Sequence, residues 1–227
     1  LWLSKRLGDA EAMLRRAAAV GRNPAVEGTL AAVMVTAGRA EEAWEVARSA
    51  AEKFPDDTTA STSLANAANF MPGIAAGETV EAQRHYGRLL ERRRPLAKRP
   101  TMRDRAGRKL RVGFVSQDLR RHSVAYFFEP LLQHLSRERF ELWCYSASAR
   151  VDEVTERLRG LSDGFRSIAG VGDERAAEMI RSDRVDVLVD LAGHTRDHRL
   201  EVFHLRPAPV QVTYLGYPNI TGLAAID

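Results

Sequence analysis

The chain has 227 residues, a formal net charge of +4, and a composition of 44% hydrophobic and 28% charged residues. These values are typical of a folded protein and exclude a disordered one, and the length allows one large domain or two modest ones. No apolar run approaches the roughly 20 residues that span a bilayer, and no secretory signal is visible at the start. The sequence begins without Met and stops at Asp227, so we expect a piece of a longer protein. We also expect no membrane partner and a cytoplasmic location.

The first 92 residues are rich in alanine and helical in period. In the stretch 24–57, Gly38 supplies a tight turn and Pro55 ends a second helix. Small residues share one face of that helix, namely Ala43, Ala47 and Ala50. This stretch resembles a tetratricopeptide repeat, and a generic helical bundle is the alternative. Two further helices are expected at 59–70 and 78–91.

Basic residues concentrate between Arg92 and Arg111, where Asp104 is the one acid. Such a run could bind nucleic acid or an acidic surface. It is interrupted by prolines and a glycine, however, and it has no interleaved aromatic residues on which bases could stack. We therefore interpret residues 93–109 as a solvated linker and expect no nucleic-acid partner.

After Leu110, short apolar runs alternate with helical patterns of about ten residues. We expect strands at 110–116, 140–147, 165–169, 185–191 and 209–215, and helices at 124–135, 152–161 and 173–182. Ser123 is the expected N-cap of the first of these helices, and Phe127 belongs to its apolar stripe. Nearly unbroken apolar strands are typical of a parallel sheet that is covered on both faces. The second half is therefore predicted to be Rossmann-like.

Cys144 is the only cysteine, which excludes an internal disulfide and a cysteine metal cluster. It lies in the apolar run 140–145, so we expect a buried strand residue and a reducing compartment. The sequence also lacks a GxGxxG motif after its first strand and a GxxxxGK[ST] motif. A dinucleotide cofactor bound in the usual Rossmann manner and P-loop nucleotide hydrolysis are therefore unsupported.

Polar residues gather after three of the expected strands, in the loops 116–123, 190–195 and 216–222. Ligands of open parallel sheets bind outside the carboxyl ends of the strands, so the three loops are expected to face one crevice. Asp118 and Asp190 could both approach it. Two carboxylates are the working pair of many glycosidases, although acids at strand ends more often cap the following turn. Asp190 is a candidate polariser or orienting residue.

His122 lies at the start of a helix, where the positive end of the helix dipole favours a neutral imidazole. A neutral ring could accept a proton from an acceptor hydroxyl, and the alternative is a loop histidine that caps the helix. His194 has the same two interpretations. His198 and His204 are expected to be surface or packing residues on the following helix. Because Gly193 indicates a turn around His194, we expect no zinc site.

Three phrases resemble one family: LRVGFVSQDLRRHSVAYFFEPLL (110–132), VDVLVDLAGHT (185–195) and LRPAPVQVTYLGYPNITG (205–222). They are similar to the N-terminal catalytic lobe of the protein O-linked N-acetylglucosamine transferases, glycosyltransferase family 41, which includes SPINDLY-like proteins. A tetratricopeptide superhelix in front of this lobe is the architecture of that family. Lysine is rare beside arginine, which would suit a bacterial member.

The resemblance implies an inverting, metal-independent GT-B enzyme without a cofactor. Its partners would be a sugar nucleotide donor, UDP-N-acetylglucosamine, and the Ser or Thr hydroxyls of an acceptor protein or peptide. The histidine after the first strand of the family's lobe matches His122, its Gly-x-Thr loop matches Gly193 and Thr195, and its LGYP phrase matches 215–218. We predict His122 and Asp190 as catalytic residues and, as substrate-binding residues, Gly193, His194, Thr195, Tyr217 and Pro218.

The sequence thus predicts an α + α/β chain. Tetratricopeptide-like helical repeats occupy 1–92, a basic linker 93–109, and a Rossmann-like parallel-sheet lobe 110–227, the N-terminal half of a GT-B catalytic unit. The C-terminal lobe, which in the family holds most of the nucleotide, is expected beyond Asp227 as a further partner, so the piece alone is expected to be inactive. Alternatives are a related protein glycosyltransferase with another sugar nucleotide donor, or a non-catalytic repeat scaffold.

Overall fold

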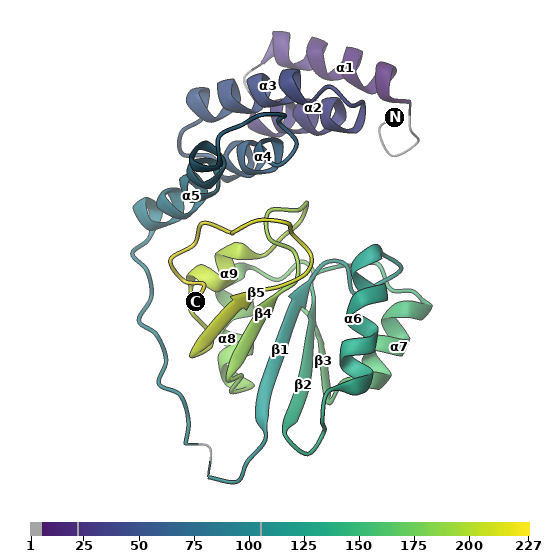
Figure 1. The fold of residues 1–227 in the computed structure, drawn as a ribbon, viewed down its shortest axis with the longest axis vertical. Helices are drawn as coiled ribbons and strands as arrows, with labels where there is room; N and C mark the ends of the chain where they lie inside the picture. The colour runs from purple at the N-terminus through teal and green to yellow at the C-terminus, as the bar shows by residue number, and fades with distance from the viewer. Residues whose placement is uncertain (1–5, 22, 105) are drawn as a thin grey trace. The chain divides into compact units, whose positions relative to one another are not determined.

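The computed structural model describes residues 6–21, 23–104 and 106–227. The chain divides into two compact units, Leu1–Arg94 and Pro95–Asp227 (Figure 1). The first unit is helical, and the second is built on a parallel sheet. Within the described residues, no helix combines the length and the apolar character needed to cross a bilayer.

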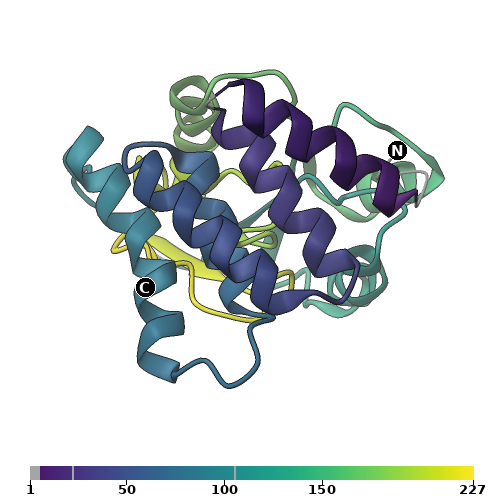
Figure 2. The same ribbon diagram turned by 90° about the horizontal axis from the view of Figure 1, so that it is seen from above.

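The first unit consists of helices that pack in chain order. They are α1 (Leu7–Val20), α2 (Pro24–Thr36), α3 (Ala40–Lys53), α4 (Thr58–Ala68) and α5 (Ala76–Arg93). Each helix packs against the next, and α4 also packs on α2, so the helices lie side by side in Figure 2 (purple to blue). Gly38 adopts a φ of +77° in the turn between α2 and α3. The predicted helical-repeat fold is confirmed.

Small residues allow the helices of this unit to approach closely. Ala43, Ala47 and Ala50 on α3 are completely buried, as the repeat pattern predicts. A Cβ atom added to Gly28 of α2 would lie 2.3 Å from the Oγ atom of Ser63 on α4. A side chain at this position would therefore displace the Ser63 hydroxyl, and glycine lets α2 and α4 pack closely there.

The second unit alternates strands and helices. In chain order they are β1 (Leu110–Ser116), α6 (Ser123–His134), β2 (Phe140–Ser146), α7 (Glu153–Leu161), β3 (Gly164–Ser167), α8 (Asp173–Ser182), β4 (Val187–Asp190), α9 (Leu200–His204) and β5 (Val210–Thr213). The strands form one parallel sheet with the order β3-β2-β1-β4-β5. The predicted Rossmann-like lobe is confirmed. Its strand order reverses between β1 and β4, which makes that gap the topological switch point.

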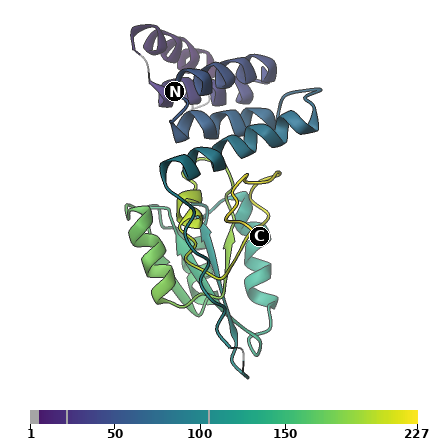
Figure 3. The ribbon, with the colours of Figure 1, turned by 90° about the vertical axis from the view of Figure 1, so that its left-hand side faces the viewer.

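Helices cover both faces of the sheet. Helices α6 and α7 lie on one face and α8 on the other, with α9 packed against α8 (Figure 3; α8 green, α6 teal). The core under α6 contains Phe114 of β1 and Phe128 of α6, whose ring centroids are 4.8 Å apart. Cys144 is part of this core, and burial raises the pKa of its thiol to about 12. It is the buried strand residue that the sequence predicts.

Three local predictions were wrong in detail. Ser123 is the first helical residue of α6, and its N-cap is His122, whose ring accepts a hydrogen bond from the Val124 amide. Phe127 lies at the edge of the apolar stripe, and 66% of it is exposed. His198 precedes α9 rather than lying on it, because the chain turns through a positive φ of 58° at Asp197.

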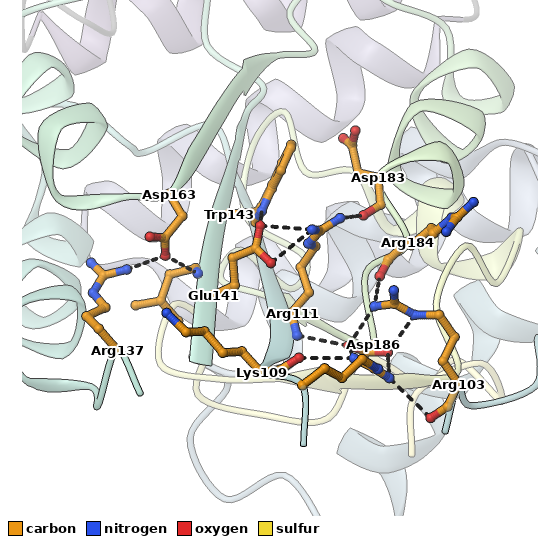
Figure 4. A network of polar contacts seen from close by, with 12 residues as sticks. Arg103, Lys109, Arg111, Arg137, Glu141, Trp143, Asp163, Asp183, Arg184 and Asp186 are labelled. Atoms are coloured by element: carbon orange, nitrogen blue, oxygen red, sulfur yellow. Dashed lines mark hydrogen bonds and ion pairs between the residues drawn. The ribbon is translucent and has the colours of Figure 1, made fainter. Parts of the chain in front are cut away.

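The basic segment before β1 is attached to the amino end of the sheet (Figure 4). Asp186, which is fully buried, accepts hydrogen bonds from Arg103, Arg108 and the Arg111 amide, with distances from 2.6 to 3.3 Å. Burial alone would raise the pKa of Asp186, but the hydrogen bonds from Arg108, the Arg111 amide and Arg103 hold it below its usual value. Two residues in the last part of the segment predicted to be a solvated linker, Arg103 and Arg108, are therefore held by one buried carboxylate.

Candidate active site

The loops that follow β1, β4 and β5 come together at the carboxyl edge of the sheet, beside the switch point. The Nε2 atom of Gln117 in the first loop donates to the Oγ1 atom of Thr195 in the second, at 3.2 Å. The ring of Tyr217 in the third loop packs against Gly193 in the second. The convergence of three polar loops, which the strand pattern predicts, is thus present in the structure.

His122 lies in the first loop and is partly open to solvent, with 37% of its side chain exposed. Its Nδ1 atom accepts a hydrogen bond from the Val124 amide at 3.3 Å, so the ring caps α6. The same Nδ1 atom lies 3.6 Å from Oδ2 of Asp118. The ring therefore has a cap partner and a carboxylate on its Nδ1 side, and its exposure leaves room for a ligand.

Asp118 is nearly buried, and its carboxylate is held from two sides. Its Oδ1 atom accepts from Nη2 of Arg120 at 3.0 Å, and its Oδ2 atom accepts from Nε2 of Gln117 at 2.8 Å. Burial raises the pKa of Asp118, and the neighbouring His122 and Arg120 oppose that rise. The sequence places Asp118 near the crevice, and the structure adds that it faces His122.

Asp190 organises the turn after β4. Its carboxylate is almost completely buried and accepts from the amides of Ala192 and Gly193, at 3.0 and 2.8 Å. Its Oδ2 atom also accepts from Oγ1 of Thr213 on β5, at 2.8 Å. Burial raises the pKa of Asp190, and these hydrogen bonds oppose the rise. With its oxygens occupied inside the protein, Asp190 can act on a ligand through the turn that it shapes.

Gly193 is required by both its conformation and its neighbours. It adopts a φ of +53°, which favours glycine, and an added Cβ atom would lie 2.3 Å from Cβ of Tyr217. Gly216 in the third loop is equally confined, since its Cβ atom would collide with the Leu191 carbonyl. The second and third loops are thus in backbone contact, and glycines make that contact possible.

His194 and His198 lie beneath this contact. His194 is fully buried and its Nε2 atom is 2.8 Å from the Thr221 carbonyl oxygen, while its ring packs edge-to-face on Tyr217. His198 has 10% of its side chain exposed, and its ring lies 5.8 Å from that of His194. Burial lowers the pKa of His194 to about 3 and that of His198 to about 4. Both rings are therefore neutral packing elements, and His204 is also buried.

The remaining predicted residues are more accessible. Thr195 and Tyr217 are half-buried and Pro218 is exposed, so all three can be reached from solvent at the loop edge. Gln117 was not singled out from the sequence, although it joins Asp118 to Thr195. Its position directly after a buried strand at the switch point was the signal that could have identified it.

A sequence model of glycosyl transferase family 41 matches residues 78–227. The chain belongs to glycosyl transferase family 41. The match starts within α5 and includes β1 to β5 with the three loops described above. The three phrases that suggested the family form the first, fourth and fifth strands with the loops that follow them.

Individual relatives agree with the family assignment. The chain is 35% identical over 178 residues to the probable UDP-N-acetylglucosamine-peptide N-acetylglucosaminyltransferase SPINDLY of Arabidopsis thaliana, which covers 76% of this chain and 19% of that protein. It is 34% identical over 125 residues to the UDP-N-acetylglucosamine-peptide N-acetylglucosaminyltransferase of Caenorhabditis elegans, covering 53% of this chain and 11% of that protein. The chain thus spans a fifth or less of the length of these curated relatives.

A solved structure extends the likeness to both units of this family 41 chain. A mutant of the Thermobaculum terrenum O-GlcNAc transferase matches with a TM-score of 0.88 and 36% sequence identity. The match covers 97% of this chain and 43% of that one. Helical repeats followed by a Rossmann-like lobe are therefore an arrangement that this chain shares with a solved O-GlcNAc transferase.

Proposed function

We propose that this chain supplies the repeat arm and the acceptor-side lobe of a protein O-glycosyltransferase. The enzyme would move N-acetylglucosamine from UDP-N-acetylglucosamine to Ser or Thr hydroxyls of an acceptor protein, with inversion and without a metal. The observation that carries the proposal is the partly exposed His122 at the carboxyl edge of the sheet, beside the switch point, in a chain of family 41. The names of the two relatives support this donor and a peptide acceptor.

The transfer requires a base, an in-line hydroxyl and a stabilised leaving group. The lone pair on Nε2 of His122 takes the hydrogen of the acceptor hydroxyl as the acceptor oxygen forms its bond to the anomeric carbon. The bond from that carbon to the diphosphate breaks, and the leaving UDP keeps the electron pair. Attack on the side opposite the leaving group gives inversion. The histidine ends protonated and returns its proton to solvent.

The second and third loops would bind the sugar nucleotide beside this histidine. Gly193 and Thr195 offer a backbone amide and a hydroxyl, and Tyr217 with Pro218 forms the accessible rim. Asp190 and His194 support these residues from below, through the bonds to the Gly193 amide and the Thr221 carbonyl. A second catalytic lobe would complete the nucleotide site, and a cytoplasmic location would give access to acceptor proteins.

The decisive experiment is mass spectrometry of an acceptor protein after incubation with the full-length enzyme and UDP-N-acetylglucosamine. We expect the added mass of one N-acetylhexosamine on Ser or Thr, with the same yield in EDTA. Parallel reactions with UDP-glucose and GDP-fucose test another donor. Transfer from GDP-fucose alone would replace the proposed donor, and transfer from none of them would favour a non-catalytic repeat scaffold.

Replacement of the proposed base gives the residue-level test. His122→Ala should lower kcat about a hundredfold or more, since general base catalysis contributes about 10²–10⁴-fold. His134→Ala is the matched control, because His134 is the last residue of the same helix, α6. Wild-type turnover in His122→Ala would remove this histidine from the mechanism.

A further inference from the structure

The Nδ1 atom of His122 lies close to two partners, one of which requires it to be unprotonated and the other protonated. The Val124 amide donates to Nδ1 at 3.3 Å, which places the hydrogen of a neutral ring on Nε2. Oδ2 of Asp118, 3.6 Å away, can accept only from a protonated Nδ1, which leaves the lone pair on Nε2. The partner chosen by Nδ1 therefore decides whether the exposed nitrogen can accept a proton.

Asp118 is the fixed member of this pair, and the ring is the movable one. The carboxylate has 6% of its surface exposed and is anchored by Arg120 at 3.0 Å and Gln117 at 2.8 Å. The charged or titratable groups that face it are Arg120 and His122 of its own loop and Asp197 of the loop after β4. A small rotation of the ring of His122 brings Nδ1 within hydrogen-bond distance of an acceptor that is already in place. Catalytic hydrogen bonds are often long before substrate binds.

We propose that Asp118 is a positioning residue that selects the Nδ1-protonated tautomer of His122 and stabilises the imidazolium formed during transfer. The proposal rests on the proposed function, since it assigns His122 the role of base. In the working state Nδ1–H donates to Oδ2 of Asp118, and Nε2 accepts the hydroxyl hydrogen of the acceptor. The proton stays on the imidazole, and the carboxylate remains ionised throughout. The Val124 amide then loses its bond to the ring and is satisfied by water at the helix end.

The kinetic test compares two acid-to-amide changes that face the same loop in the full-length enzyme. Asp118→Asn should lower kcat about tenfold or more, with the KM for the sugar nucleotide unchanged within about twofold. Asp118→Glu should recover part of the loss. Glu153→Gln is the control, because Glu153 is an exposed carboxylate that binds Arg121, next to His122. It should retain wild-type kcat.

The pH profile separates a positioning role from a merely structural one. Loss of the carboxylate makes protonation of the imidazole less favourable, so the acidic limb of kcat/KM should move to lower pH in Asp118→Asn. A lower kcat with an unmoved acidic limb would overturn the proposal, as would a loss confined to KM. Wild-type kcat in Asp118→Asn would overturn it as well.

Nitrogen-15 NMR of the His122 ring tests the same pairing without any activity. We expect Nδ1 of His122 to carry hydrogen in a larger fraction of molecules in the wild type than in Asp118→Asn, with signals assigned from His122→Gln. An equal fraction in both proteins would overturn the proposal. If Asp118→Asn does not fold, a ring of His122 that stays predominantly Nε2-protonated in the wild type with UDP and an acceptor peptide bound would overturn the proposal. A wild-type enzyme that transfers no sugar would end the proposed function, and the NMR result would still decide the pairing.

Discussion

Asp186 at the amino end of the sheet is surrounded by donors, whereas His122 at the carboxyl end shares one nitrogen between two distant partners. Asp186 has no exposed surface and accepts from two arginines and an amide at distances down to 2.6 Å. His122 has 37% of its side chain exposed, with contacts of 3.3 and 3.6 Å. The hydrogen-bonding capacity of Asp186 is used within the protein, whereas the exposed ring of His122 can still bind a ligand.

The difference assigns separate tasks to the two ends of one sheet. A buried carboxylate with several hydrogen-bond donors fixes the chain before β1 in one arrangement. A loosely held imidazole at the switch point can change partner when a substrate arrives. Stability should therefore respond mostly to changes at the amino end, and turnover to changes at the carboxyl end. Changes in stability can test that division, and the largest is expected at the amino end.

Asp186→Ala should cause the largest loss of stability. It leaves Arg103, Arg108 and the Arg111 amide without their shared acceptor. Breaking a buried ion pair typically costs 3–5 kcal/mol, and we expect about 3 kcal/mol because both arginines are partly exposed. Urea unfolding at neutral pH measures the loss, and kcat of the folded full-length variant should stay near wild type.

Asp186→Asn is the matched control for that change. Its amide oxygen keeps one acceptor and the side-chain volume, so the loss should be clearly smaller than in Asp186→Ala. An unchanged free energy of unfolding in Asp186→Ala would mean that the ion pairs at the amino end do not stabilise the fold. A large loss of kcat with intact stability would remove the division of tasks between the two ends.

Acidification should weaken the carboxyl end first. Unfolded histidine has a pKa of about 6.5, while burial lowers the pKa of His194 to about 3 and that of His198 to about 4. The unfolded chain therefore binds more protons than the folded chain below neutral pH. The stability that these neutral rings contribute is complete above about pH 6.5, and it falls as the pH drops toward the pKa values of the folded state. Each of these two histidines should lower the free energy of unfolding by about 1.2 kcal/mol as the pH falls from about 7 to about 5.5.

Urea unfolding of the wild type and of His198→Asn at those two pH values measures this effect. Asparagine keeps an acceptor close to the position of Nδ1, which accepts from the Leu200 amide. On acidification, the free energy of unfolding of the variant should fall by about 1.2 kcal/mol less than that of the wild type. The carboxylate of Asp186, whose pKa is held below its usual value, stays ionised over this range, so the amino end contributes no such change. An identical pH response of both proteins would contradict the buried neutral state of His198.

The strand and helix pattern allowed most of the fold to be predicted, because buried parallel strands and amphipathic helices carry distinct periods. The apolar run around Val187 predicts β4, and Asp152 predicts the start of α7 that it caps. The ends of α6 and α9 were less predictable. His122 replaces Ser123 as the cap, since an imidazole nitrogen can accept from the helix just as a hydroxyl can.

The site was predictable in its location and less so in its contacts. Strand order decides which loops meet, and the alternating pattern implies that order closely enough to bring His122, Thr195 and Tyr217 to one edge. Hydrogen bonds between residues far apart in the sequence leave no periodic pattern from which they could be predicted. Nothing near Gln117 indicates that its amide reaches Thr195, and nothing near Arg108 indicates that Asp186 accepts its guanidinium. The same limit hid the burial of His194.

The smallest effect is expected from an exposed ion pair, and it shows why burial separates the two ends. Glu156 and Arg159 on α7 are 2.7 Å apart, with 54% and 46% of their side chains exposed. Glu156→Gln should cost about 0.3 kcal/mol, because solvent screens an exposed pair and both side chains lose rotamer freedom in forming it. The difference from wild type in urea unfolding should vanish in about 1 M NaCl, where the screening length is about 3 Å. A loss near that of Asp186→Ala would mean that the number of ion pairs, rather than burial of the acid, stabilises this arginine-rich chain.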